Sequence, residues 1–107
     1  MQRLEVVLTL SAYDDLDRIT DYLIERDEAA AEKTYRRIMD STKQLSTFPQ
    51  MGTLMEDAEL RSEGHRKLVV DDFVVVYRIF EENVVVYHVF NCLQDYGKVF
   101  QPRSKER

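Results

Sequence analysis

The apolar residues of this sequence follow a helical spacing in the first half of the chain and a strand-like alternation after about residue 65. This change constrains the fold more than any other feature of the sequence. Residues 66–70, 73–80 and 84–90 are rich in β-branched and aromatic side chains. They are separated by Asp71-Asp72 and by the segment 81–83, which reads Glu-Glu-Asn. Short apolar segments with turn residues between them are typical of neighbouring antiparallel strands. The second half of the chain therefore predicts a three-strand meander.

The first half of the chain predicts one strand and two helices. Leu4, Val6 and Leu8 alternate with polar residues, which is the period of a half-buried strand. A helix is then predicted from Ser11, whose spacing to Asp14 resembles a capping box. Its apolar stripe consists of Tyr13, Leu16, Ile19, Leu23 and Ile24, and the acidic residues opposite it are expected to be solvated: Asp14, Asp15, Asp17, Asp21 and Glu25.

A second helical pattern resumes after Asp27 and ends before Pro49, because proline cannot continue a helix. Its apolar positions are Ala31, Tyr35, Ile38, Thr42 and Leu45. The short connection predicts an antiparallel helical hairpin. Residues 49–64 predict a long surface connection that holds at most a short turn. The element order β-α-α-β-β-β predicts an α+β fold with the helices on one face of the sheet.

Composition limits the protein class. The 107 residues, 44% hydrophobic and 33% charged, predict a single domain over 1–107. Cys92 is the only cysteine, which excludes an internal disulfide and is consistent with a reducing cytoplasm. No apolar run is long enough for a membrane span, so no membrane partner is expected. The net charge of −5 argues against indiscriminate nucleic-acid binding.

Charge is uneven along the chain. Residues 1–60 hold seven Lys or Arg against thirteen Asp or Glu, a balance of −6, and residues 61–107 hold eight against seven, a balance of +1. His65 and His88 are too few and too distant in sequence for a metal motif, and no glycine-rich phosphate loop exists. We therefore expect no metal and no cofactor.

The turn between the last two predicted strands decides which side chains share a face. A three-residue loop over 81–83, with Asn83 in the left-handed conformation, places Arg78 and His88 on one face. A two-residue loop shifts the register by one and separates them. Asn83 favours the longer loop, because asparagine tolerates positive φ better than most residues. With the longer loop, that face also holds Val74, Val76, Phe80, Val84, Val86 and Phe90, and the uncharged face is expected to meet the helices: Phe73, Val75, Tyr77, Ile79, Val85, Tyr87 and Val89.

Five segments in order resemble the RelE/ParE superfamily of bacterial type II toxins, which includes plasmid-stabilisation toxins. They are the first strand with the helical hairpin, FPQMG (48–52), HRKLVV (65–70), VVVYRIF (74–80) and VYHVFNCLQDY (86–96). The resemblance covers about residues 3–98. It implies a growth-inhibiting cytoplasmic toxin, held in a hetero-oligomer by a cognate antitoxin.

The superfamily divides into two modes of action. RelE-like members are ribosome-dependent endoribonucleases that cut messenger RNA, which needs cations at the phosphate and a proton carrier. The resemblance implies catalytic roles for Arg78, His88 and Tyr96, and substrate binding by Arg66, Lys67 and Asp95. Under the cleavage hypothesis, one concave face of the sheet and its rim are expected to hold Arg66, Arg78, His88 and Tyr96. ParE-like members instead inhibit DNA gyrase by protein contact. The arginine pair that frequently precedes "DY" in the family is Leu93-Gln94 here, which weakens the cleavage hypothesis. Cleavage of messenger RNA is still the action that we predict first, with gyrase inhibition as the alternative.

Each candidate residue also has a structural interpretation. Arg78 is equally explained by an ion pair or an antitoxin contact, and His88 by a single hydrogen bond within the sheet. Arg66 and Lys67 are typical of a solvated strand edge. Asp95 is typical of a turn cap, and Tyr96 with Phe100 of a short helix anchor. A third possibility is an attenuated, non-toxic member that only binds an antitoxin.

Overall fold

A computed structural model of the protein describes residues 3–91. The chain begins with strand β1 (Glu5–Leu8) and the helices α1 (Leu10–Ile24) and α2 (Glu28–Lys43). Two 3-10 turns follow, η1 (Gln44–Ser46) and η2 (Pro49–Met51), and then strand β2 (Thr53–Leu54) and helix α3 (Ala58–Ser62). The meander consists of β3 (Arg66–Val70), β4 (Phe73–Ile79) and β5 (Asn83–Asn91).

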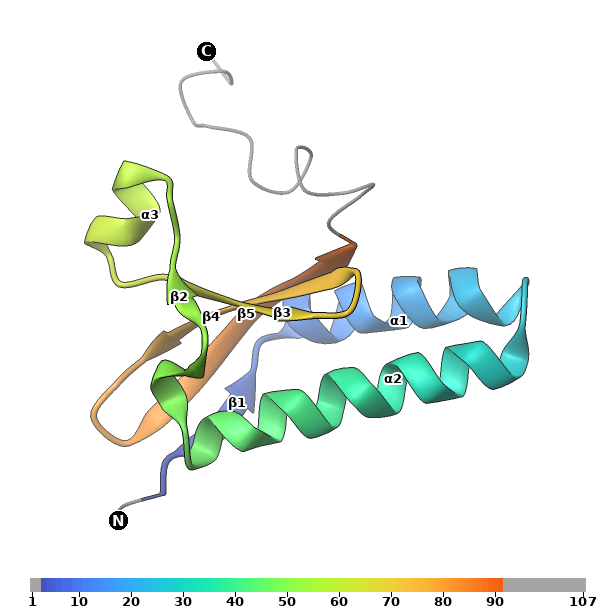
Figure 1. Ribbon diagram of the computed structural model, residues 1–107, viewed down its shortest axis with the longest axis horizontal. Coiled ribbons are helices and arrows are strands. Elements are labelled where there is room, and N and C mark those ends of the chain that lie inside the picture. The colour runs from blue at the N-terminus through green and yellow to red at the C-terminus, as the bar shows by residue number, and fades with distance from the viewer. Residues whose placement is uncertain (1–2, 92–107) are drawn as a thin grey trace.

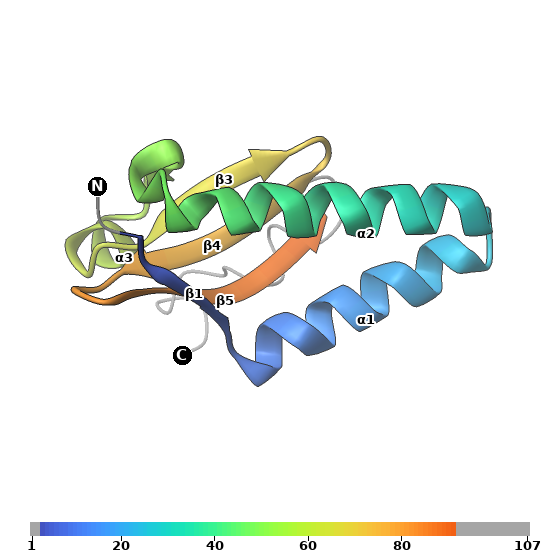
Figure 2. The same ribbon diagram turned by 90° about the horizontal axis from the view of Figure 1, so that it is seen from below.

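The strands form one five-stranded sheet in the order β1-β5-β4-β3-β2 (Figure 1). β1 runs parallel to β5, and all other neighbours are antiparallel. Helices α1 and α2 lie side by side along the sheet, as Figure 2 shows from below. The predicted α+β fold, with its N-terminal strand, helical hairpin and three-strand meander, is confirmed.

The helix starts are set by two side-chain caps. Thr9 caps α1, and its Oγ1 accepts a hydrogen bond from the Ala12 amide at 3.1 Å. The prediction that Ser11 opens the helix as a capping box is wrong, because Ser11 already lies in its first turn. Asp27 caps α2 through the amides of Ala29 and Ala30, which explains the break in the pattern there.

The connection 49–64 holds more structure than expected. β2 pairs with β3 and becomes an edge strand, with Thr53 opposite Lys67. α3 is capped by Asp57, whose carboxylate accepts from the Leu60 amide at 3.0 Å. A two-residue strand is too short to produce a periodic pattern, so the prediction of an almost structureless connection is wrong.

One face of the sheet packs against the helical hairpin. Leu16 of α1 and Ile38 of α2 share a buried core with Val75 and Tyr77 of β4. Because alternate residues of a strand point to opposite faces, this face belongs to the odd-numbered residues of β4. A smaller buried cluster on the opposite face consists of Val74, Val76 and Phe90.

The β4–β5 turn corrects the predicted register. The Phe80 amide donates to the Asn83 carbonyl at 2.7 Å, so the loop has two residues. Asn83 is not left-handed, because Asp71 is the one non-glycine residue with positive φ among residues 3–91. The prediction of a three-residue loop is wrong. Val84 and Val86 consequently face the helices, and Val85 lies opposite Arg78 instead.

A β-bulge within β5 then reverses the effect of the shorter loop. Tyr77 pairs with Val86 but Val76 pairs with His88, so Tyr87 is an extra residue in the ladder. Beyond the bulge, the register is the one that the longer loop would have produced. His88 therefore lies opposite Val76 and on the same face as Arg78.

Candidate functional site

Three of the predicted site residues lie on one face of the sheet. Lys67 pairs with Val76, and Val76 pairs with His88, so the three form a row across β3, β4 and β5. Arg78 lies two residues along β4 and points to the same side. We call Lys67, Arg78 and His88 the polar row.

Arg66 does not belong to the polar row. It pairs with Tyr77, whose side chain lies in the core beneath the helices. Its guanidinium Nη1 donates to the Gly52 carbonyl at 2.8 Å. The expectation that Arg66 lines the same face as Arg78 and His88 is therefore wrong.

His88 is held by a carboxylate from α1. Its Nδ1 lies 3.0 Å from Oδ2 of Asp15, and the side chains are 37% and 6% exposed, respectively. The same Oδ2 accepts the Val89 amide at 3.0 Å, and Oδ1 accepts from the Arg18 guanidinium. We call Asp15, Arg18, His88 and Val89 the Asp15 cluster. A carboxylate facing Nδ1 orients the imidazole, which suits either a structural role or proton transfer.

The position of Asp15 follows from where β1 ends. Beyond Leu8 the edge of β5 has no strand beside it, and α1 supplies the missing partners. The Thr9 amide donates to the Val86 carbonyl at 3.0 Å, and Thr9 Oγ1 donates to the Tyr87 carbonyl at 3.1 Å. Asp15 then accepts the next edge amide, so α1 continues the sheet edge with side chains.

The prediction that Asp15 is solvated is wrong. It lies three residues after Ala12 and four before Ile19, both of which face the sheet. That spacing puts it on the flank of the buried stripe rather than opposite to it. This spacing was the available signal for a buried carboxylate.

The two cations of the polar row have neighbours within the chain. The ammonium Nζ of Lys67 lies 3.7 Å from Oε1 of Glu56, whose side chain is exposed. The guanidinium carbon of Arg78 lies 4.9 Å from the centre of the Phe80 ring, a cation–π distance. A phosphate could reach this face, but it would compete with an ion pair at Lys67.

The FPQMG segment is fastened by a second buried polar group. The Tyr77 hydroxyl donates to the Pro49 carbonyl at 2.7 Å and accepts from the Gly52 amide at 2.9 Å. Burial raises the pKa of the Tyr77 hydroxyl, which keeps it neutral. With the Arg66 guanidinium on the Gly52 carbonyl, these contacts form what we call the Tyr77 cluster. Its residues hold a loop, which gives Arg66 a structural role.

Two further predictions concern residues beyond the described part of the chain. Asp95 and Tyr96 lie outside residues 3–91, as do Leu93 and Gln94.

Among the described residues, no group of three or more His, Cys, Asp or Glu side chains is placed to hold a metal ion. A search of the same residues for a helix of the length and apolarity that a membrane crossing requires found none.

Solved structures with the same fold include two that come from bacterial toxin–antitoxin systems. The chromosomal ParDE system from P. aeruginosa superposes with a TM-score of 0.70 at 20% identity, covering 83% of this chain and 96% of that one. The toxin–antitoxin complex RelBE2 from Mycobacterium tuberculosis gives 0.59 at 22% identity, covering 83% and 98%. The YoeB dimer from Staphylococcus aureus gives 0.55 at 13% identity, covering 80% and 93%. These similarities show the fold.

The sequence itself decides the family. No curated protein sequence matches the chain significantly. The profile of one family, described as the ParE toxin of the type II toxin–antitoxin system parDE, matches residues 6–96. That range contains the helices α1, α2 and α3 and the whole meander, and it extends to residue 96. The protein belongs to the ParE toxin family of type II toxin–antitoxin systems.

Proposed function

We propose that this ParE-family toxin inhibits growth by binding a protein target, DNA gyrase, in the cytoplasm. The observation that carries the proposal is the position of Arg66, which bonds Gly52 on the helix side of the sheet, away from Arg78 and His88. The strand cations that an RNA-cleaving site would bring to one phosphate are thus divided between the two faces.

The chemistry of cleavage explains why this division matters. Attack of a 2′-hydroxyl on the adjacent phosphate accumulates negative charge, and several cations around that phosphate would stabilise it. Here Lys67 already has an acidic neighbour, and Arg66 is occupied by a backbone carbonyl. The acidic first half of the chain adds repulsion toward a polyanion. A protein target requires none of these cations.

We further propose that a cognate antitoxin holds the toxin inactive. The similar structures from P. aeruginosa and Mycobacterium tuberculosis are a ParDE system and a RelBE2 toxin–antitoxin complex. Co-expression with a neighbouring small reading frame tests this partner. The expected outcome is that the two proteins copurify and that growth recovers.

Ribosome-dependent cleavage of messenger RNA remains a second candidate, because the polar row places two cations and a histidine on one face. The Asp15 carboxylate orients the imidazole of His88 within that row. If this face cut RNA, His88 would transfer the proton and Arg78 would stabilise the phosphate charge.

Parallel assays with the purified chain separate the two candidates. One assay measures supercoiling by purified gyrase, and the other maps new 3′ ends in a message translated by purified ribosomes. We expect supercoiling to stop and the message to stay intact. New 3′ ends that require ribosomes, with supercoiling unaffected, would replace the proposal by the second candidate. Harmless expression and inactivity in both assays would identify an attenuated member.

Two variants sharpen this test. His88→Gln removes the ionisable ring and Arg78→Gln the cation of the polar row, and Lys33→Gln provides a surface control outside the row. Under the gyrase proposal, His88→Gln retains inhibition of supercoiling at equal folded concentration. Under the cleavage hypothesis, both row variants lose at least about 100-fold in cleavage rate while the control keeps it.

A further inference from the structure

The segment between β2 and β3 leaves the sheet and returns to it at one point. The Met55 amide donates to the His65 carbonyl at 2.9 Å, so the two ends of the segment are joined at its base. Met55 is buried and anchors the first end. Residues 56–63, which lie between these ends, hold four acidic residues against one arginine, a balance of −3. We call them the acidic flap.

The body of the acidic flap has few contacts that would resist movement. It consists mainly of α3, and none of the residues of α3 is buried. Figure 1 shows α3 standing off the sheet on the side away from α1 and α2. Gly64 joins the flap to β3 with a φ of +87°, and a Cβ at this position would meet nothing within 4 Å. The base of the flap is therefore fixed, while its body is loosely held.

The flap lies on the same side of the sheet as the polar row. His65 precedes Arg66, which points toward the helices, so the His65 side chain shares the face of Lys67. The centre of its ring lies 5.6 Å from that of Tyr87, the extra residue of the bulge in β5. The second end of the flap is thus anchored on the face that carries the polar row.

Two carboxylates of the flap contact this face. Oε1 of Glu56 lies 3.7 Å from Nζ of Lys67, and Glu56 is 85% exposed whereas Lys67 is 24% exposed. Oε1 of Glu63 lies 3.6 Å from Nδ1 of His65. The same Nδ1 lies 3.2 Å from the Leu60 carbonyl oxygen, which can only accept, so Nδ1 carries a proton. Solvated carboxylates of the flap are thereby brought to half-buried groups of the sheet.

The physical chemistry of such contacts favours control over stability. Exposed ion pairs stabilise a fold little and are screened by salt, so the flap can open at small cost. Their effect on a charged ligand is larger, because a segment of charge −3 beside Lys67 cancels the positive potential that would attract a phosphate.

We propose that the acidic flap is an autoinhibitory contact that keeps phosphate-bearing chains, such as single-stranded RNA, off the polar row. In the closed position the Glu56 carboxylate occupies the Lys67 ammonium. When the flap swings about its base between Met55 and Gly64, that ammonium becomes available beside Arg78. The inference goes beyond the proposed function, because it concerns which ligands this face admits and not which target the toxin inhibits.

Neutralising the flap gives the first test. Binding of a short fluorescent single-stranded RNA is measured by anisotropy at low salt, with wild type and with Glu56→Gln/Glu63→Gln. We expect the flap variant to bind at least about fivefold more tightly. Asp14→Asn/Asp17→Asn, on the exposed side of α1, makes the same change in net charge and should bind within about twofold of wild type. No gain in the flap variant, or equal gains in both, would overturn the proposal.

A double-mutant cycle tests whether Glu56 acts through Lys67. Alone, Glu56→Gln should raise RNA affinity at least about threefold, but in a Lys67→Gln background it should change the affinity by less than about twofold. An equal gain in both backgrounds contradicts the proposed contact.

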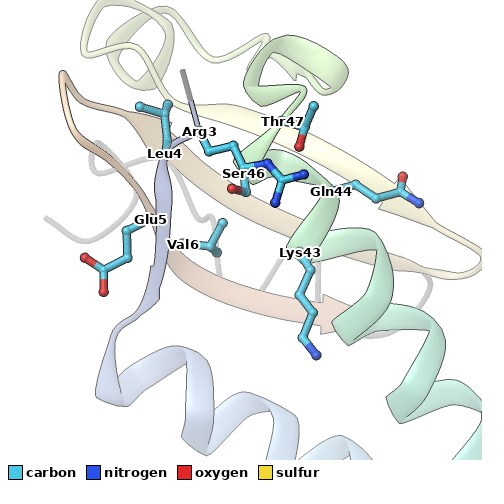
Figure 3. Close-up of a pocket in the computed structure, with 8 residues that line it drawn as sticks. All are labelled: Arg3, Leu4, Glu5, Val6, Lys43, Gln44, Ser46 and Thr47. Atoms are coloured by element: carbon cyan, nitrogen blue, oxygen red, sulfur yellow. The ribbon is translucent and has the colours of Figure 1, made fainter. Parts of the chain in front are cut away.

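The position of the bound RNA is tested in the flap variant. Adding Arg78→Gln should lower its RNA affinity at least about threefold, because Arg78 belongs to the polar row. The control is Lys43→Gln, which lies on the helix side of the sheet in a groove beside β1 (Figure 3). It should change the affinity by less than about twofold. A larger loss at Lys43 than at Arg78 would place the RNA elsewhere and refute the proposal.

Gyrase inhibition provides an independent readout. The flap variant should inhibit supercoiling within about twofold of wild type at equal folded concentration, because the flap is not required for a protein target. A chain that leaves gyrase unaffected would end the proposed function, while the RNA measurements would still decide the role of the flap. Loss of gyrase inhibition without a gain in RNA affinity would assign the flap to a target contact and overturn the inference.

Discussion

The Asp15 cluster and the Tyr77 cluster solve the same structural problem with different chemistry. Each fastens a segment outside the sheet to its strands: α1 to the edge of β5, and the FPQMG segment to β3 and β4. The Asp15 cluster does so with a carboxylate that can only accept. The Tyr77 cluster does so with a hydroxyl that donates to one backbone group and accepts from another.

This difference decides how each cluster should respond to change. A buried carboxylate with an arginine, a histidine and an amide around it leaves several unsatisfied groups when it is removed. A neutral hydroxyl leaves two backbone groups, and the close fit of Gly52 adds a steric constraint. The predictions below run from the largest expected loss of stability to the smallest.

Removing the Asp15 carboxylate should cost the most. We expect Asp15→Ala to lower the free energy of unfolding by about 3 kcal/mol, because the Val89 amide and His88 lose their acceptor in a buried place. Urea unfolding measures the change. Asp17→Ala on the same helix, which is exposed, should stay within about 0.5 kcal/mol. Equal losses in the two variants would mean that the cluster does not fasten α1.

Adding a methyl group at Gly52 tests the fit of the FPQMG segment. A Cβ there would lie 2.5 Å from the Lys67 carbonyl oxygen and 2.7 Å from the Tyr77 hydroxyl, so Gly52→Ala should cost about 2 kcal/mol. Gly64→Ala is the matched control, because its φ is +87° but its Cβ would meet nothing within 4 Å. It should cost about 1 kcal/mol, from backbone strain alone. A larger loss at Gly64 would contradict close packing at Gly52.

Removing only the Tyr77 hydroxyl separates its hydrogen bonds from its packing. Tyr77→Phe should lower the free energy of unfolding by about 1.5 kcal/mol at neutral pH, because two backbone groups lose their partner. Tyr13→Phe, at an exposed tyrosine, should have almost no effect.

Alkaline pH gives the same cluster a second test. Burial raises the pKa of Tyr77 above its ordinary value of 10.0, so the folded state keeps a proton that the unfolded chain has released. The contribution of the protonated Tyr77 hydroxyl to the free energy of unfolding is therefore fully present below about pH 10 and declines as pH rises through the folded pKa. The decline should be shallower in Tyr77→Phe. An identical alkaline slope in both proteins would show that Tyr77 titrates as in the unfolded chain.

The exposed pair of Arg37 and Asp71 should show the smallest effect. Nε of Arg37 lies 2.6 Å from Oδ2 of Asp71, and this hydrogen bond lowers the pKa of Asp71 below its ordinary value of 3.8. The pair's contribution is present above that ordinary value and is lost as pH falls through the folded pKa. Asp71→Asn keeps a residue that tolerates the φ of 56° and removes the charge. Urea unfolding should show a small loss in the free energy of unfolding at neutral pH, and this loss should vanish at acid pH. A loss that persists at acid pH would show that the substitution acts through the turn and not through the ion pair.

Periodic features of the sequence predicted the fold well. The alternation around Val6, the stripe through Leu16 and the β-branched strands from residue 66 all depend on local patterning, and the helices and the meander formed where those patterns lie. β2 escaped prediction because two residues have no period, and because it follows directly after Gly52, which is held by Tyr77, a residue far away in the sequence.

The candidate site was predicted less completely, for a physical reason. Lys67, Arg78 and His88 share a face, but Arg66 does not, since adjacent residues of a strand point to opposite sides. Asp15 was missed because it was grouped with the other acidic residues of the helix as solvated, although it lies beside the apolar stripe. Its partner amide on Val89 is exposed to α1 only where β1 ends, which no local pattern records.

The bulge at Tyr87 has a consequence for comparing this toxin with distant relatives. One residue removed from the turn after Phe80 and one added at Tyr87 leave the length of the hairpin unchanged. A relative with a longer turn and a straight strand would carry the same number of residues and present its histidine to the same side. An ungapped alignment of the two would match every position between turn and bulge to a residue of opposite orientation. Pairing two compensating gaps restores the correspondence, and a chimera of two such toxins should exchange the hairpin as one piece.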